Sequence, residues 1–250
     1  MTLLEIALDD VAGARIAELA GADRVELCSG LDSGGVTPTI GIALAAASAL
    51  HHTEMQSSQL RGTELALLIR PRAGDFVYTP DEAAVMVADV RALRQEIPSA
   101  SFVVGALTAD GDIDVPVIER LLDAAGGADV AFHRAVDSTR DLGASVDLLA
   151  QLGLRRVLTS GARRTAVDGI PALRALVESV GDAITIVAGG GVRPDNAQRI
   201  VAETGVREVH LRAARQRASA SGWRNPEQDY DVDLLETDGE LIAQMRALLS

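Results

Sequence analysis

The sequence contains no lysine: all 23 basic side chains among its 250 residues are arginine. A side-chain Schiff base needs a lysine amine, so lysine-dependent aldolase chemistry and pyridoxal phosphate chemistry are excluded. Any anion that the protein binds must therefore be held by arginine, by backbone N–H groups or by a metal ion.

Cysteine and aromatic residues are also scarce. Cys28 is the single cysteine, which excludes an intrachain disulfide and is typical of proteins in a reducing cytosol. Aromatic residues make up 2% of the chain and hydrophobic residues 48%. The core is therefore expected to consist mainly of Ala, Val, Leu and Ile.

Long apolar runs and excess positive charge are absent too. No apolar run approaches the roughly 20 residues of a membrane-spanning helix. Residues 1–10 lack the basic start and apolar stretch of a signal peptide. The net charge of -13 disfavours nucleic acid and anionic membranes as partners. These features predict a cytoplasmic protein that binds neither.

Strand-like and helix-like segments alternate along the whole chain. Segments such as 11–21 and 81–97 carry apolar residues at helical spacing. Thr79, followed by Pro80 and two acidic residues, is typical of a helix start. Eight apolar runs are interpreted as strands, at residues 3–8, 24–28, 65–69, 102–106, 129–133, 156–160, 184–188 and 208–212.

Eight strand–helix units predict a single α/β domain over residues 1–250, a (β/α)8 barrel of the TIM type. A doubly wound sheet is the alternative, but it normally needs fewer units. Two segments depart from the repeat. Residues 51–64 form a polar insertion, whose His51 and His52 are expected to face solvent, and 214–233 form an irregular segment after the eighth strand. A final helix is expected over 239–249.

Charged residues on the predicted strands point to the barrel interior. Because residues two apart in a strand share a face, Arg24, Glu26 and Cys28 lie together, opposite two apolar residues. The apolar face is expected to pack on the helices, which turns the polar face inward, where mid-strand Glu5 is also expected. Buried charges must be paired. A structural ion network that includes Arg70 is one interpretation, and a binding site, favoured by the number of strands involved, is the other.

Polar residues also gather at the carboxyl ends of the predicted strands, where TIM barrels place their active sites. Arg70 and Arg72 flank Pro71 at the end of an apolar strand, which predicts a stiff turn that aims both guanidinium groups over the barrel mouth. His133 has a similar position and could act as an acid or base near neutral pH. The other residues at such ends are Asp75, Arg134, Asp137 and Ser160.

Three consecutive glycines, Gly189, Gly190 and Gly191, lie between the seventh strand and a helix expected to start near Pro194. Glycines let backbone N–H groups approach an anion, and a helix N-terminus favours negative charge. The alternative is that these glycines serve only a tight turn.

Six segments together resemble the CutC family, the copper homeostasis protein family, in order and with similar spacing from residue 3 to about residue 213. They are residues 21–41, 69–79, 132–137, 157–162, 188–196 and 208–213. The resemblance implies a TIM barrel, a cytoplasmic location, a homodimer or larger homo-oligomer, and binding of copper through cysteine. The matching polar positions are Glu5, Arg24, Glu26, Arg70, Arg72, Asp75, His133, Arg134, Asp137, Ser160 and His210.

Among the family's cysteine positions, only Cys28 carries a thiol in this sequence, and Cys28 is therefore the candidate copper ligand. Ala7 and Leu8 stand where many members have thiols at the end of the first strand. Because copper(I) prefers soft sulfur donors, we predict that this chain binds copper(I) weakly.

Two functions are open at this point. The first is the family's, a copper homeostasis protein. The second is a metabolic enzyme with no copper role, which acts at the barrel mouth on a small phosphorylated or carboxylated metabolite. The candidate catalytic residues are Glu5, Glu26, His133 and Asp137. The candidate ligand-binding residues are Arg24, Arg70, Arg72, Asp75, Arg134, Ser160, Gly189, Gly190, Gly191 and His210.

Overall fold

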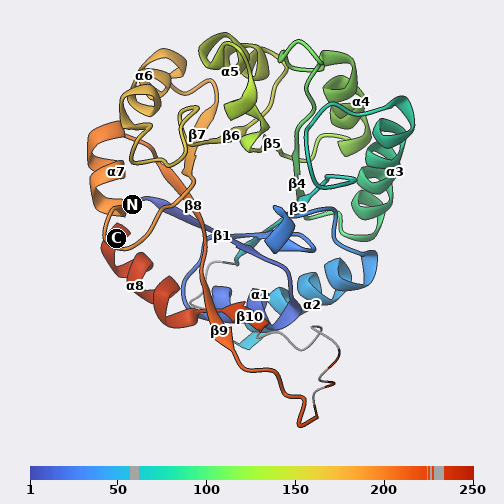
Figure 1. Ribbon diagram of the computed structural model, residues 1–250, viewed down its shortest axis with the longest axis vertical. Coiled ribbons are helices and arrows are strands. Elements are labelled where there is room, and N and C mark those ends of the chain that lie inside the picture. Colours follow the sequence, from blue (N-terminus) through green and yellow to red (C-terminus); the bar gives the residue numbers. More distant parts are fainter. Residues whose placement is uncertain (57–61, 224, 226, 228–233) are drawn as a thin grey trace.

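The computed structural model describes residues 1–56, 62–223, 225, 227 and 234–250, with only the backbone described for 51–56. Eight parallel strands pair in sequence order and close into a barrel (Figure 1). They are β1 (Leu3–Leu8), β2 (Arg24–Leu27), β3 (Glu64–Leu68), β4 (Ser101–Val104), β5 (Val130–Phe132), β6 (Arg156–Thr159), β7 (Thr185–Gly189) and β8 (Glu208–Arg212). The predicted TIM barrel is confirmed.

Helices surround the barrel as an outer ring (Figure 1). They are α1 (Val11–Leu19), α2 (Ile40–Gln56), α3 (Pro80–Glu96), α4 (Val115–Ala125), α5 (Leu142–Gln151), α6 (Ile170–Val180), α7 (Ala197–Thr204) and α8 (Gly239–Leu249). Two short 3-10 helices, η1 (Leu31–Ser33) and η2 (Arg134–Ser138), follow β2 and β5. None of the helices, as far as they are described, is both long and apolar enough to cross a membrane.

Local sequence determines where the helices α3 and α7 begin. Thr79 caps α3 as predicted: its side chain accepts from the N–H of Glu82, whose carboxylate accepts from the N–H of Thr79. The helix α7 begins at Ala197 rather than near Pro194. The reason is a turn in which the side chain of Asn196 accepts from the N–H of Arg193.

Two irregular segments differ from their sequence-based description. Residues 51–56 continue α2, because nothing in them interrupts a helix; 57–61, like the side chains of His51 and His52, lie outside the described residues. In the second segment, β9 (Ala214–Arg217) pairs antiparallel with β10 (Leu234–Thr237). Glu236 joins the pair by binding Arg215 at 2.9 Å and Arg217 at 3.2 Å. The final helix α8 matches its prediction.

Alternate residues of β2 separate the two sides of the barrel wall. Val25 and Leu27 belong to the core between strands and helices. Cys28 instead joins an inner cluster with Ala66, Leu68, Val103 and Ala131. The polar face of β2 therefore points into the barrel, as the alternation predicted.

An ion network fills the floor of the barrel, at the amino ends of the strands. Buried Arg24 donates from Nη1 to Glu5 at 3.0 Å and to Glu208 at 2.8 Å, and from Nε to Glu64 at 2.8 Å. Arg156 adds a contact of 3.2 Å to Glu64. We call these five residues the floor network. The floor network corresponds to the ion network predicted from the sequence, but its membership differs. Among the described residues, Glu64, Glu208 and Arg156 belong to it, and Glu26 and Arg70 do not.

We predict that Arg24→Met lowers the free energy of unfolding by about 3–5 kcal/mol, because it removes the cation that three carboxylates at the floor share. Urea denaturation measures the change. The control is Arg207→Met, since Arg207 pairs with Asp182 at 2.8 Å with both side chains mostly exposed. That variant should change the free energy by at most about 1 kcal/mol. Equal, small effects in both variants would contradict a structural role for the floor network.

Candidate functional site

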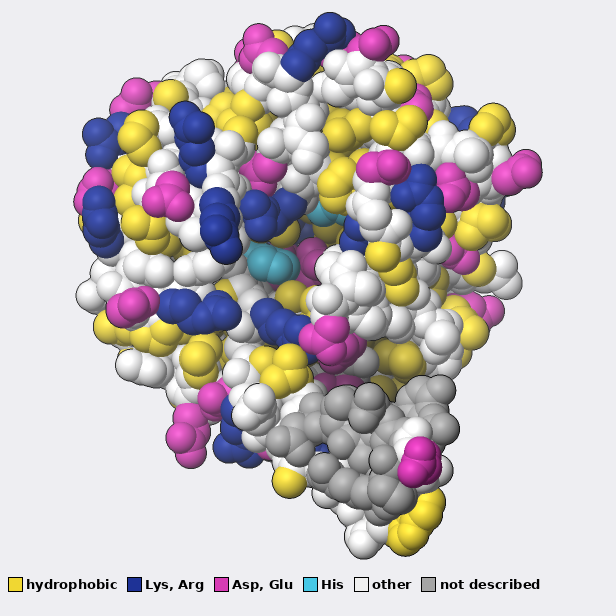
Figure 2. All heavy atoms as spheres, in the orientation of Figure 1, with side chains coloured by type: hydrophobic (Ala, Val, Ile, Leu, Met, Phe, Trp, Pro, Cys, Tyr) yellow, Lys and Arg dark blue, Asp and Glu magenta, His cyan; other side chains and the backbone are white. Residues whose placement is uncertain are grey.

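A cavity of about 160 Å³ opens at the carboxyl ends of the strands, and we call it the mouth cavity. Figure 2 shows histidine side chains at the bottom of this hollow, with arginine side chains beside them. Its lining comes from strands and loops around the barrel: Ala7, Glu26, Leu31, Gly34, Leu68, Arg70, Phe76, His133, Arg134, Leu158 and His210. A larger cavity of about 350 Å³ lies near α6 and the amino end of β7. Its charged residues, Asp182 and Arg207, pair with each other, whereas the mouth cavity is lined by several of the predicted site residues.

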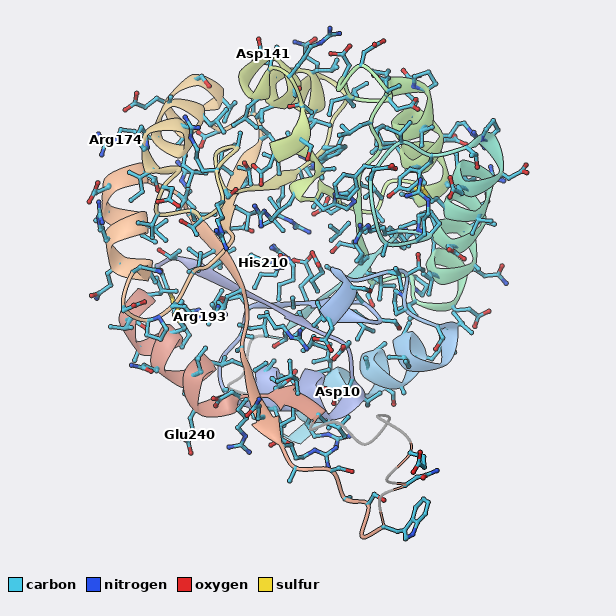
Figure 3. All side chains as sticks on the ribbon, viewed as in Figure 1. Asp10, Asp141, Arg174, Arg193, His210 and Glu240 are labelled. Atoms are coloured by element: carbon cyan, nitrogen blue, oxygen red, sulfur yellow. The ribbon has the colours of Figure 1, made fainter. Side chains whose placement is uncertain are left out.

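Glu26 and His210 line the mouth cavity, and both lie close to buried Glu5. Strand register explains the meeting, because Glu5 is the register partner of His210, and Ala7 that of Glu26. His210 points from β8 toward the barrel centre (Figure 3), and its Nδ1 lies 2.7 Å from Glu5 Oε1. One ligand atom from each of the three residues lies within 4.8 Å of the others. We call them the acid–histidine trio.

The three pKa values of the trio move apart. Burial would raise the pKa of Glu5, but the hydrogen bond from His210 and the charges of His210, Arg24 and Arg156 outweigh it and lower the pKa to about 2. Burial raises the pKa of Glu26 to about 7, and one of its oxygens, Oε2, has no hydrogen-bond partner among the described residues. Burial would lower the pKa of His210, but the hydrogen bond with Glu5 and the charges of Glu26 and Glu5 raise it. The trio therefore holds an ionised acid, an acid poised near neutral pH and a basic imidazole.

His133 lies on another side of the mouth cavity, in a fixed orientation. Its Nδ1 accepts from the N–H of Ala135 at 3.1 Å. Gly105 packs against the ring so closely that a Cβ there would lie 2.2 Å from its Cε1. Burial and the charge of Arg70 lower the pKa of His133 to about 3, so the ring is neutral at physiological pH.

Pro71 separates two arginines that point in different directions. Buried Arg70 lines the mouth cavity and donates to the carbonyls of Gly34 at 3.1 Å, Gly35 at 3.0 Å and Gly74 at 2.8 Å. Arg72 instead binds Glu82 at 2.6 Å and Asp75 at 3.0 Å on the surface. The prediction that both arginines lie over the mouth is therefore corrected: Arg72 and Asp75 form a surface cluster that holds the loop.

Arg134, Asp137 and Ser160 connect the loops after β5 and β6. Asp137 accepts from the N–H groups of Ser160 at 3.1 Å and Ala162 at 3.0 Å, and it binds Arg134 at 2.9 Å. Arg134 also donates to Ser160 Oγ at 2.8 Å. Asp137 thus occupies the backbone N–H groups of this loop and orients Arg134, whose side chain lines the mouth cavity.

Packing explains why glycines follow β7. Gly190 has a φ of 98°, and a Cβ there would lie 3.2 Å from the Arg134 guanidinium carbon. At Gly189 a Cβ would lie 2.5 Å from Leu158. Gly191 also has a positive φ, 73°. The glycine run therefore allows a tight turn and the close approach of Arg134, which corresponds to the alternative interpretation of this motif.

Comparison with known proteins identifies the family of this chain. A sequence profile described as the CutC family matches residues 2–215. The chain belongs to the CutC family. A relative from Pasteurella multocida, strain Pm70, named a family protein CutC, is 39% identical over 230 residues, which cover 92% of this chain and 86% of the relative.

Two further relatives extend the comparison. The human relative, named "Copper homeostasis protein cutC homolog", is 40% identical over 223 residues, which cover 89% of this chain and 77% of the relative. A solved CutC structure from Streptococcus agalactiae is 36% identical, with a TM-score of 0.77, and the match covers 84% of this chain and 98% of that one. The family and the barrel predicted from the sequence are thus both confirmed.

Cys28, the candidate copper ligand of this CutC chain, lies in apolar surroundings. Its thiol is fully buried and donates to the carbonyl of Leu8 at 3.6 Å. Burial and the negative charges of Glu26 and Asp9 raise the pKa of this thiol. Cys28 belongs to no cluster of metal-ligating side chains among the described residues, and its burial disfavours the thiolate that a copper(I) site needs.

Several functional residues were not identified from the sequence. Phe76 contacts two residues of the site: its ring centroid lies 5.0 Å from that of His133 and 5.0 Å from the Arg70 guanidinium carbon. The sequence does contain a sign of its role, because Phe76 is one of only 3 phenylalanines and directly follows a polar turn. Glu64, Arg156 and Glu208 had a weaker signal, since each is a charged residue at the start of an apolar strand.

His133 should make this CutC chain sensitive to acid. Because its pKa is about 3 in the folded chain and 6.5 ordinarily, the folded state disfavours the proton. The stability that comes from the neutral ring is complete above pH 6.5 and is lost as the pH falls toward 3. At pH 4 the loss amounts to about 3 kcal/mol.

The test is His133→Asn, whose side-chain oxygen can still accept from the N–H of Ala135. Urea denaturation should find the variant less stable than the wild type at pH 7, because ring packing is lost. The gap should close by about 3 kcal/mol at pH 4, where only the wild type has to protonate a buried ring. A gap of the same size at both pH values would show that His133 does not titrate as described.

Proposed function

We propose that this CutC chain takes part in copper homeostasis and binds copper as Cu²⁺, through the nitrogen and oxygen donors of the acid–histidine trio. The observation that carries the proposal is the trio itself, whose ligand atoms lie within 4.8 Å of one another and two of whose members, Glu26 and His210, line the mouth cavity. The names of the CutC relatives favour this role over that of a metabolic enzyme with no copper role.

The donor set supports a divalent ion. Imidazole and carboxylate groups suit Cu²⁺, and Cu²⁺ stands highest in affinity among the divalent first-row metals. Glu26 has an oxygen with no partner among the described residues, so it could bind an ion without breaking a hydrogen bond. Glu5 already contacts His210 through Oε1 and Arg24 through Oε2, so the floor network would orient the ligands.

We predict that one Cu²⁺ ion binds per chain and that Glu26→Gln or His210→Gln weakens binding by more than about 100-fold, because each removes a ligand. Isothermal titration gives the affinity, and electron paramagnetic resonance reports nitrogen and oxygen ligands. His51→Gln and His52→Gln should be present in all variants, since adjacent histidines can bind Cu²⁺ by themselves.

Two control variants distinguish copper binding at the trio from binding at the Cys28 thiol or at the other histidine of the mouth cavity. Cys28→Ser and His133→Gln should both keep the wild-type affinity, because neither residue belongs to the trio. Loss of binding in Cys28→Ser, with full binding in Glu26→Gln, would instead assign copper to the thiol. A wild-type chain that binds no Cu²⁺ would contradict the copper part of the proposal.

We further propose that the protein works in the cytoplasm as a homodimer or larger homo-oligomer. The reducing compartment is supported by the single cysteine, and the assembly by the family resemblance. Sedimentation equilibrium of the purified chain tests the assembly, and a mass near the monomer's 26.1 kDa would overturn it.

A further inference from the structure

One side of the mouth cavity carries a buried cation without a counter-ion. The side chain of Arg70 lies at the cavity, and the residue is only 6% exposed. Its hydrogen bonds to other described residues end on three backbone carbonyls, and none of the described carboxylates forms a salt bridge with it. Because a buried charge is costly unless an opposite charge compensates it, this arrangement favours an anion nearby.

His133 adds a hydrogen-bond donor without a partner. Since its Nδ1 accepts from the N–H of Ala135, the neutral ring carries its proton on Nε2. That Nε2 is buried and has no hydrogen-bond partner among the described residues, in a side chain that lines the mouth cavity. An unpaired buried donor is rare in folded proteins and is expected where a ligand completes the hydrogen bond.

Phe76 holds these two groups on the same side of the cavity. Its ring lies 5.0 Å from the Arg70 guanidinium carbon and 5.0 Å from the His133 ring centroid. Arg134, which forms a salt bridge with Asp137 and donates to Ser160 Oγ, adds a second guanidinium group to the cavity lining. We call Arg70, Phe76, His133 and Arg134 the cationic wall.

We propose that the cationic wall binds the oxyanion group of a small acid, with His133 Nε2 donating to one of its oxygens, Arg70 supplying the compensating charge and Arg134 a further guanidinium group. The cavity of about 160 Å³ is smaller than the roughly 300–1,000 Å³ of sites for drug-sized ligands, so it fits a compact acid. Carboxylate and phosphate groups share this chemistry. The inference is independent of copper, since it uses none of the trio.

The test uses chelator-treated, metal-free protein, so that a failure of copper binding cannot affect it. Phosphate, sulfate, malonate and succinate are titrated separately in a thermal-shift assay, with glycerol as the uncharged control. We expect at least one anion to raise Tm with saturation at one site per chain, because binding stabilises the native state by mass action. The most effective anion distinguishes a carboxylate from a phosphate site.

Two substitutions at one position separate the donor from the fold. His133→Gln can place its amide N–H near the former Nε2, whereas His133→Asn is too short to do so. The asparagine variant should lose at least 10-fold in anion affinity, and the glutamine variant should stay within about 3-fold of the wild type. Arg72→Gln, outside the cavity, should bind as the wild type does.

Nitrogen NMR of the wild type supplies a result that needs no variant. The His133 ring should show a protonated Nε2 whose resonance shifts on addition of the bound anion. A wild-type chain that responds to none of the four anions would overturn the proposal. So would an unchanged His133 resonance at saturation, or wild-type affinity in His133→Asn.

Discussion

The site depends on the salt bridges that the guanidinium group of Arg24 forms. It binds carboxylates from β1, β3 and β8 while it belongs to β2, so it joins four neighbouring strands at the floor of the barrel. One of these carboxylates is Glu5, which uses its other oxygen to hold His210. A continuous chain of charged hydrogen bonds therefore runs from the floor to the mouth cavity and positions the imidazole there.

The charged side chains at the floor pair with one another, whereas several of those at the mouth do not. At the floor, Arg24 and Arg156 meet three carboxylates at hydrogen-bond distance. At the mouth, Glu26 and His133 each keep a buried polar atom without a partner among the described residues, and Arg70 donates to backbone carbonyls rather than to a described carboxylate. Since burial of unmatched polar groups costs free energy, the mismatch at the mouth is what a binding site requires before its ligand arrives.

The proposed copper site of this CutC chain depends on which of its donor groups suit the metal. The single thiol is buried among apolar side chains, which disfavour the thiolate, the soft donor that copper(I) prefers. Two of the oxygen and nitrogen donors of the trio, Glu26 and His210, instead line the mouth cavity. The cationic wall near the same cavity makes it two-sided, with groups for a cation and groups for an anion.

The sequence by itself determined the eight strands, the inward face of β2, the Thr79 cap and the family, because alternation, capping and motif spacing are local properties of the chain. It also indicated that acids, histidines and arginines gather inside the barrel. Only the tertiary structure decided which of them meet. Pairing of Glu5 with His210 follows from the register between β1 and β8, at opposite ends of the chain. The separation of Arg70 from Arg72 follows from distant loop carbonyls, and the protonated state of Cys28 from its packing. Such contacts depend on strand register and chain closure, which no local pattern encodes.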